Sequence, residues 1–333
     1  MPKEQLEKKY YLGIDLGGTK ILSGLYNREL SFLGKNKKRT KAERGYKSVL
    51  ERIVRCITEL LDDFDVQLGE VAAVGIGSPG SITRDGKVVF AGNLGWKDVS
   101  LKKDLEEILK VPVFVENDCN IAALGIYHHE LKGEPENMVG IFLGTGVGSG
   151  IIINRHLYRG SHMIAGEVGH MVIDLFGEKC NCGNRGCLEV YASRRTIFKK
   201  IDDAVCKGED SILVDMVQSQ GKDFSNLRSG DLLKAIRAGD KCVEKIINDV
   251  ADYVGIAVAN VINFLDPDAV MLGGGVIDAL EDYIMPILIK RAREYTFPGI
   301  PQTLKIAASK LGDDAGITGG AVLALRSSLG KSC

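Results

Sequence analysis

The sequence predicts an α/β protein with two related halves, and three observations lead to this class. A pattern of strand, glycine turn and strand occurs twice, about 127 residues apart. Apolar stretches typical of strands alternate with stretches of helical period. The chain has 333 residues and a hydrophobic content of 45%, enough for about two separate cores.

The first copy of the repeat is Tyr11–Tyr26, with the sequence YLGIDLGGTKILSGLY. The second copy is Val139–Ile153, with the sequence VGIFLGTGVGSGIII. A shared Gly-Ile-x-Leu-Gly motif starts at Gly13 and again at Gly140. In each turn, backbone N–H groups and a threonine hydroxyl could cradle phosphate oxygens. For either turn alone, a β-hairpin that needs glycines at positive φ is the alternative interpretation.

The elements between and after the repeats follow from periodicity and from turn residues. A helix is expected where apolar side chains recur on one face, and a strand where a short apolar run ends in glycine, proline or a polar pair. The expected elements are a helix at Tyr46–Phe64, strands at Val71–Gly77 and Val113–Glu116, a helix from Asp118 through Tyr127, a helix at Val243–Phe264 and a strand at 269–272. The last strand ends in three glycines, Gly273, Gly274 and Gly275, which permit close approach of the backbone to a ligand.

A cluster of metal-binding residue types lies in the middle of the chain. His170, Cys180, Cys182 and Cys187 fall within 18 residues and match the Cys₃His pattern of a structural zinc site. The alternative is a surface loop with free cysteines. Two acids, Glu167 and Glu189, bracket the cluster, so we expect it to hold a polar site in place as well as to staple the fold.

Several protein classes are disfavoured by composition. A net charge of −1 gives no reason to expect nucleic acid or anionic membrane as a partner, and the basic run Lys35–Arg44 is expected to be a solvated strand edge or loop. The longest uncharged stretch, Met138–Ile153, is too short and glycine-rich to span a bilayer. The first nine residues are polar, which predicts no signal peptide, so the eight cysteines are expected to be reduced in a cytoplasmic protein.

The glycine turns match neither common nucleotide motif. The chain contains no GxxxxGK[ST] loop, and none of the three turns shows GxGxxG opening a helix with an acid following. The two repeat copies differ at Asp15, which stands where the second copy has Phe142. A carboxylate beside a phosphate turn predicts an anchor for Mg²⁺.

Seven motifs, taken in order, give a specific resemblance. They are GIDLGGTK, GIGSPGSI, NLGW, VENDCNIAA, LGTGVGSG, GEVGH and CNCGNRGCLE. Together they resemble the ROK family of sugar kinases, and within it the bacterial glucokinases, from about Tyr10 to about Leu325. The resemblance implies the actin-like ATPase fold of ribonuclease H type, with ATP and sugar held in a cleft between two α/β domains. The expected domains are 1–119 with about 317–333, and 120–316 with the zinc site.

The same resemblance implies transfer of phosphate from ATP to a hexose. The reaction that it indicates first is the conversion of D-glucose to glucose 6-phosphate. The family's catalytic aspartate falls on Asp118, which would accept the proton of the attacking sugar hydroxyl. The competing interpretation is that Asp118 only caps the helix that follows it.

The resemblance also places binding residues. The implied sugar contacts are Pro79, Gly80, Asn93, Asn117, Asp118, Glu167, His170 and Glu189. Asn93 could instead be only a turn residue before Gly95. The implied contacts to ATP and its Mg²⁺ are Asp15, Gly17, Gly18, Thr19, Lys20, Gly144, Thr145 and Gly146, with Gly273, Gly274 and Gly275 near the adenosine. Lys20 could equally be a solvated strand lysine.

Several functions compete with glucose phosphorylation. The family includes sugar-responsive repressors, which need an N-terminal DNA-binding domain, and only nine residues precede Tyr10. A non-catalytic sugar sensor would not need Asp118 together with complete phosphate turns, and a zinc-ribbon nucleic-acid binder would need a basic face. The nearest alternative is a kinase for fructose, N-acetylglucosamine or N-acetylmannosamine. The resemblance further suggests a homodimer.

Overall fold

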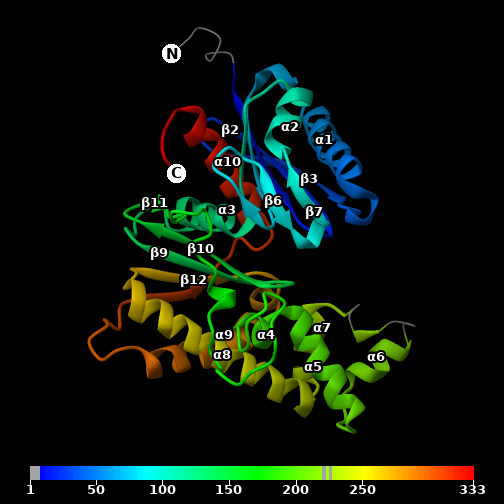
Figure 1. The fold of residues 1–333 in the computed structure, drawn as a ribbon, viewed down its shortest axis with the longest axis vertical. Coiled ribbons are helices and arrows are strands. Elements are labelled where there is room, and N and C mark those ends of the chain that lie inside the picture. Colours follow the sequence, from blue (N-terminus) through cyan, green and yellow to red (C-terminus); the bar gives the residue numbers. More distant parts are fainter. Residues whose placement is uncertain (1–7, 220–222, 225–226) are drawn as a thin grey trace. The chain divides into compact units, whose positions relative to one another are not determined.

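The structure is a computed structural model that describes residues 8–219, 223–224 and 227–333, and these residues form two compact units (Figure 1). The first unit contains the described residues up to Glu136, together with Gly150–Ala165 and Asp313–Cys333. The second unit contains Asn137–Ser149 and Gly166–Gly312. The chain therefore passes between the units several times, and its last helix returns to the first.

A mixed five-stranded sheet organises the first unit, in the order β3-β2-β1-β4-β8. Its strands are β1 (Tyr10–Leu16), β2 (Lys20–Asn27), β3 (Phe32–Arg39), β4 (Val71–Ser78) and β8 (Val113–Asn117). Strands β1, β2 and β3 pair antiparallel, whereas β4 lies parallel to β1 and β8 parallel to β4. Strand β3 carries most of the basic run and alternates between exposed and half-buried residues, which confirms the expected solvated strand edge.

Side chains of β1 alternate between two differently covered faces, as a strand of period 2 requires. Leu12, Ile14 and Leu16 pack with apolar residues of α1 (Gly45–Asp63) and α2 (Leu101–Leu109). Tyr11 packs instead with Ala321 of α10 (Asp314–Ser328), which covers the other face. A small sheet of β5 (Ser81–Ile82), β6 (Val88–Ala91) and β7 (Trp96–Val99) completes this unit with α3 (Asp118–Gly125).

Helix α10 approaches its neighbours at backbone distance because glycines line the contacts. A Cβ atom on Gly13 of β1 would overlap the Ile317 carbonyl, and one on Gly75 of β4 would overlap the Gly320 carbonyl. A Cβ on Gly319 would likewise overlap the Ile121 carbonyl of α3. This packing groups α3 with the first unit, whereas the domain limits expected from the resemblance place residues from 120 onward in the second part.

A second five-stranded sheet, in the order β11-β10-β9-β12-β13, contributes β9, β12 and β13 to the second unit. Strands β9 (Met138–Leu143), β12 (Ala269–Gly273) and β13 (Lys305–Ala308) are parallel, and the chain leaves the unit along β10 (Val147–Ile153), which pairs with β11 (His156–Leu157). The helices of this unit are α4 (Glu189–Ala192), α5 (Arg194–Cys206), α6 (Leu213–Ser219), α7 (Ser229–Arg237), α8 (Lys241–Leu265) and α9 (Gly275–Tyr295).

Helix α8 shows how local sequence sets the limits of an element. Its N-cap Asp240 accepts a hydrogen bond from the Val243 N–H at 3.0 Å, and Asp266 ends it in the left-handed region just before Pro267. The helix predicted at Val243–Phe264 is therefore confirmed. It starts two residues earlier, at Lys241, and ends one residue later, at Leu265. Within the described ranges, none of the helices combines the length and the apolar character needed to cross a membrane.

The close packing of α10 gives a stability prediction. We expect Gly319→Ala to lower the free energy of unfolding by about 1–3 kcal/mol, because the new methyl group overlaps the Ile121 carbonyl and the helices must separate. Gly230→Ala in α7 is the matched control, since nothing lies within 4 Å of its Cβ position, and it should be neutral or stabilising by up to about 1 kcal/mol. Denaturant unfolding measures both, and equal stabilities for the two variants would contradict this packing model.

Candidate functional site

The first phosphate turn is a tight connection between β1 and β2. The Gly17 N–H donates to the Lys20 carbonyl at 2.8 Å, and the buried Thr40 fastens the turn from outside through its hydroxyl, which donates to the Gly17 carbonyl at 2.6 Å. Neither Gly17 nor Gly18 has a positive φ. The turn does join two antiparallel strands, but the alternative interpretation, in which its glycines are needed for a positive φ, is wrong. They leave the backbone of the turn free of side chains, with Thr19 exposed at its tip.

The second turn repeats this arrangement between β9 and β10. The Gly144 N–H donates to the Gly146 carbonyl at 2.9 Å, and again neither glycine has a positive φ. Glu189, the first residue of α4, accepts a hydrogen bond from the Val147 N–H at 3.1 Å, directly after the turn. A Cβ on Gly146 would collide with the Glu189 carboxylate. A predicted sugar contact therefore lies against a predicted phosphate turn.

Asp15 and Asp118 form an acidic pair in the first unit. Burial raises the pKa of Asp15 to about 7, and the neighbouring Asp118 raises it further, while Lys20 lowers it. Burial also raises the pKa of Asp118, although hydrogen bonds from Cys119 oppose the shift. A buried carboxyl whose ionisation is disfavoured by a neighbouring carboxylate can accept a proton or, together with that neighbour, share a divalent cation. Lys20 forms an ion pair with Asp313, whose side chain is mostly exposed.

The end of β8 positions Asp118. Asn117 is the N-cap of α3, because its side-chain oxygen accepts hydrogen bonds from the N–H groups of Cys119 at 2.9 Å and Asn120 at 3.1 Å. Asp118 is the first residue of the helix and accepts from the Cys119 N–H at 2.9 Å. The cap role that competed with catalysis thus belongs to Asn117. Its amide donates to the Gly80 carbonyl at 3.3 Å, which joins two predicted sugar contacts.

The remaining predicted sugar contacts of this unit surround the same place. Gly80 has a φ of 95°, and a Cβ there would overlap the Phe90 carbonyl, so the Pro79-Gly80 turn requires glycine. Asn93 lies in a short 3-10 turn that Gly95 closes in the left-handed region. Its side chain is exposed and, within the described part of the chain, bonds to no protein group. A Cβ on Gly18 would lie 3.1 Å from the Asn93 carbonyl oxygen, so Asn93 borders the phosphate turn.

The four zinc-type residues come together in the second unit. The ligand atoms of His170, Cys180, Cys182 and Cys187 all lie within 4.8 Å of one another. The Cys180 Sγ is 3.8 Å from the His170 Nδ1, and the Cys182 and Cys187 sulfurs are 3.6 Å apart. A tetrahedral zinc site with Zn–S bonds of about 2.3 Å has edges of about 3.8 Å, so the donor set and its spacing fit zinc.

The predicted acids beside this cluster have different surroundings. The His170 Nε2 lies 3.9 Å from a Glu167 carboxylate oxygen, while Nδ1 faces the cysteines. Glu167 is mostly exposed and precedes the 3-10 turn that carries His170. Glu189 follows Cys187 by two residues and bonds to the second phosphate turn. The loop that holds the cluster therefore carries both acids.

Glycines at the end of β12 lie beside β9, the strand that leads into the second phosphate turn. A Cβ on Gly273 would contact the Phe142 ring at 3.1 Å, and one on Gly274 would lie 2.6 Å from the Leu143 carbonyl oxygen. Gly274 has a φ of 88°, so this position requires glycine, and Gly275 begins α9. The first N–H groups of α9 have no partner within the helix, and they lie next to these glycines, where no side chain covers the backbone.

Three positioning features had no expectation from sequence. Thr40 fastens the first turn, Asp313 pairs with Lys20, and Gly316 packs where a Cβ would lie 2.8 Å from the Asp15 carboxyl carbon. The run GDDAGITGGA before and within α10 was the available signal for the last two, since its glycines permit close packing and its acids favour a helix start.

The chain is similar to known proteins over most of its length. A model of the ROK family matches residues 11–327. The glucokinase of Halalkalibacterium halodurans is 34% identical over 317 residues, which cover 95% of this chain and 94% of the relative. The glucokinase of Thermotoga maritima is 36% identical over 324 residues, which cover 96% and 97%. The xylose repressor of Bacillus subtilis is 32% identical over 242 residues, which cover 73% of this chain and 58% of the repressor.

A solved structure extends the similarity to three dimensions. The ROK family glucokinase from Streptomyces griseus, crystallised in complex with glucose and AMPPNP, superposes with a TM-score of 0.82 at 30% identity, covering 95% of this chain and 99% of that one. The mixed α/β sheets of both units are consistent with an actin-like ATPase fold. The resemblance carried by the seven sequence motifs is thereby confirmed, and the chain belongs to the ROK family.

Proposed function

We propose that this protein is a sugar kinase that transfers the γ-phosphate of ATP to D-glucose, forming glucose 6-phosphate. The observation that carries the proposal is the acidic pair Asp15 and Asp118, set between a phosphate turn and exposed amide groups in the first unit. The similarity to two glucokinases over nearly the whole chain supports both the reaction and the sugar.

Asp118 is the general base of the proposed reaction. As the sugar hydroxyl attacks the γ-phosphorus, its oxygen forms the new P–O bond and its proton passes to the Asp118 carboxylate. The bond from the γ-phosphorus to the bridging oxygen breaks, and ADP leaves. A raised pKa suits this role, because it makes the carboxylate a better proton acceptor.

ATP and its Mg²⁺ provide the phosphate and neutralise its charge. Asp15 would anchor the Mg²⁺ shell, since a divalent cation offsets the cost of ionising a buried carboxyl beside Asp118. Gly17, Gly18 and Thr19 would cradle phosphate oxygens, with Gly144, Thr145 and Gly146 as the second clamp. Lys20 would orient the first turn through Asp313. Gly273, Gly274 and Gly275 would lie near the adenosine.

Sugar recognition needs fixed donors and acceptors for each hydroxyl. Asn93, Asn117 and the Pro79-Gly80 turn would contact the sugar from the first unit. Glu167, His170 and Glu189 would contribute from the second unit. Among these, Asn93 and Glu167 have exposed side chains, which a sugar can reach.

We further infer that His170, Cys180, Cys182 and Cys187 hold one structural zinc ion. When bound, zinc cross-links the loop through four ligands and supplies no open position for chemistry. The residues that act on the sugar are Glu167 and Glu189, whose positions depend on that loop. A homodimer in the cytoplasm is part of the same proposal.

A sugar-binding regulator is the second candidate, because xylose repressors are among the relatives. Such a protein would bind sugar without turnover and would not depend on a general base. The catalytic variant below separates the two functions.

We expect Asp118→Asn to reduce kcat by about 10²–10⁴-fold, the usual contribution of a general base. Asparagine retains a hydrogen-bond acceptor for the Cys119 N–H, and Asn117 still caps α3, so stability and glucose affinity should change little. Steady-state kinetics and calorimetry measure these quantities, with the exposed Asp62→Asn as control. Turnover at the wild-type rate would remove Asp118 from the mechanism, and absence of turnover in the wild type would favour the regulator.

We expect about one zinc per chain, because one Cys₃His set is present. Cys182→Ser should lower zinc content and glucose affinity together, since the loop carrying both acids loses a ligand. Cys206→Ser, an exposed cysteine of α5 outside the cluster, should change neither. Elemental analysis and calorimetry test this directly, and full activity of metal-free protein after chelation would refute the structural role.

We expect glucose to give a higher kcat/KM than fructose, N-acetylglucosamine or N-acetylmannosamine. A site that pairs particular hydroxyls leaves polar groups unpaired when a hydroxyl is moved or replaced, so discrimination can be large. A panel of these sugars with ATP, followed by ADP release, makes the comparison. A higher kcat/KM for another sugar would contradict the choice of glucose as substrate but not the assignment as a kinase.

A further inference from the structure

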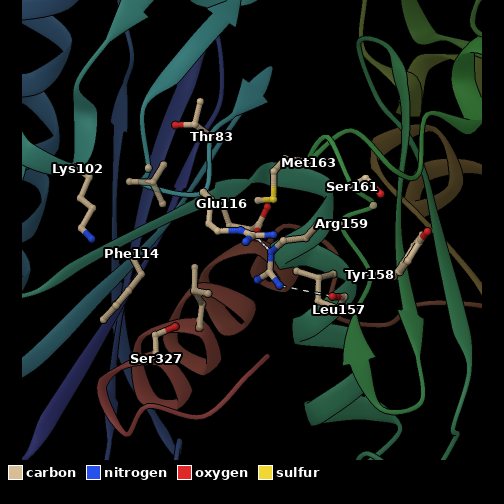
Figure 2. Close-up of a pocket in the computed structure, with 15 residues that line it drawn as sticks. Thr83, Lys102, Phe114, Glu116, Leu157, Tyr158, Arg159, Ser161, Met163 and Ser327 are labelled. Atoms are coloured by element: carbon tan, nitrogen blue, oxygen red, sulfur yellow. Dashed lines mark hydrogen bonds and ion pairs between the residues drawn. The ribbon is translucent and has the colours of Figure 1, made fainter.

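A cavity of about 490 Å³ lies wholly within the first unit and is lined by none of the residues assigned to sugar, ATP or zinc above (Figure 2). Its walls come from the turn after β5, the start of α2, strand β8, the segment after β11 and the last turns of α10. A volume of this size is in the range of small-molecule sites, about 300–1,000 Å³.

The cavity follows the open edge of the sheet. It touches Phe114, Val115 and Glu116, three consecutive residues of β8, whose side chains point to alternate faces. Among the described strands, β8 ends the sheet order, so no further strand pairs with this edge. A bound molecule can therefore reach main-chain polar groups of β8 as well as side chains.

The cavity is distinct from the catalytic groups. Gly316 of α10 packs against Asp15, whereas Leu323 and Ser327 of the same helix line the cavity. At about 1.5 Å per residue, Ser327 lies about 16 Å along the helix from Gly316. Asp118, Asn117 and Asn93 do not line it.

Three of the fifteen residues that line the cavity are cationic, and one is acidic. Arg84 and Lys102 both face the cavity, and within the described residues neither has an acidic partner at ion-pair distance. The Lys102 ammonium lies 5.7 Å from the centre of the Phe114 ring, on one wall in Figure 2. Asp85 is near enough for Lys102 to contribute to lowering its pKa, but Asp85 does not line the cavity.

Arg159 provides a third cation with unused donors. Its guanidinium is three-quarters buried and has five N–H donors, of which one bonds to Glu116 and one to the Leu157 carbonyl at 3.5 Å. Figure 2 shows both contacts inside the cavity. The donors that remain can bind an oxyanion without breaking the pair with Glu116.

We propose that this cavity binds a small phosphate monoester. Arg84, Lys102 and the free donors of Arg159 would hold the phosphate, since guanidinium and ammonium groups are the common partners of phosphate oxygens. The single acid in the lining, Glu116, is 4% exposed and fully engaged, because it also accepts from the Asn117 N–H at 2.9 Å and the Asn120 amide at 3.0 Å. The lining thus keeps a positive charge for the ligand.

The same contacts link the cavity to the base. Glu116 holds Asn117 and Asn120, the residues on either side of the Asp118 helix start, and Arg159 holds Glu116. A phosphate bound to the remaining Arg159 donors leaves this ion pair in place but offsets part of the positive charge that Glu116 faces. The bound phosphate ester therefore changes kcat. This effect rests on the proposed kinase function, whereas binding of the ester does not depend on it.

The test is calorimetric titration of the full chain with glycerol 3-phosphate, which has a phosphate monoester but neither a hexose ring nor a base. We expect saturable binding that persists when glucose and AMPPNP are present in excess. The double variant Arg84→Ala/Lys102→Ala should bind at least about tenfold more weakly, because charge-assisted hydrogen bonds are lost. Lys103→Ala, a neighbouring exposed lysine outside the cavity, should bind like the wild type, and glycerol should not bind.

The other possible results each overturn either the binding site or its effect on kcat. Absence of binding, equal affinity in the double variant, or loss of binding in the presence of glucose and AMPPNP would overturn the site. Glycerol 3-phosphate should also change the kcat of the wild type and leave that of the double variant unchanged. Binding in the cavity with an unaltered kcat would keep the site and overturn its effector role, and a chain without kinase activity would still permit the binding test.

Discussion

The backbone-to-backbone packing of α10 is the constraint on which the first unit depends. Glycines of β1, β4 and α10 allow carbonyl groups to lie where side chains would normally stand. Such contacts contribute dispersion energy over a large area and tolerate no added volume. They also fix two groups of the proposed site at once, because Gly316 packs against Asp15 and Gly319 packs against the helix that begins at Asp118.

The acidic pair is locally unfavourable, and the rigid packing of α10 allows the fold to tolerate it. Burial raises the pKa of both carboxyls, so their charged forms are disfavoured without a partner. A rigid frame keeps the two groups together despite that cost, and Mg²⁺ or a transferred proton offsets it during the proposed reaction. Electrostatic strain of this kind is common at sites that bind cations or move protons.

The second unit uses a different means to hold its polar groups. The loop with His170 and the three cysteines has little regular secondary structure, and its exposed apolar side chains Leu175 and Phe176 add nothing to a core. Four ligands around the proposed zinc ion would replace the missing hydrophobic packing. Glu189 is then tied to the phosphate turn by a main-chain hydrogen bond, so one loop would connect sugar recognition with phosphate binding.

Much of this protein follows from its sequence alone. The repeated strand-turn-strand units, the helix at 46–64, the long helix before Asp266 and the four zinc-type residues depend on local periodicity or spacing, which the chain carries within short windows. Family membership followed from seven short motifs. The residues that support them could not be predicted this way. Thr40 on Gly17, Asp313 on Lys20 and Arg159 on Glu116 are pairs separated by 23 or more residues, and only the folded sheet and α10 bring them together. The capping role of Asn117 in place of Asp118 was also decided by the turn out of β8, because hydrogen-bond geometry and not residue type selects the cap.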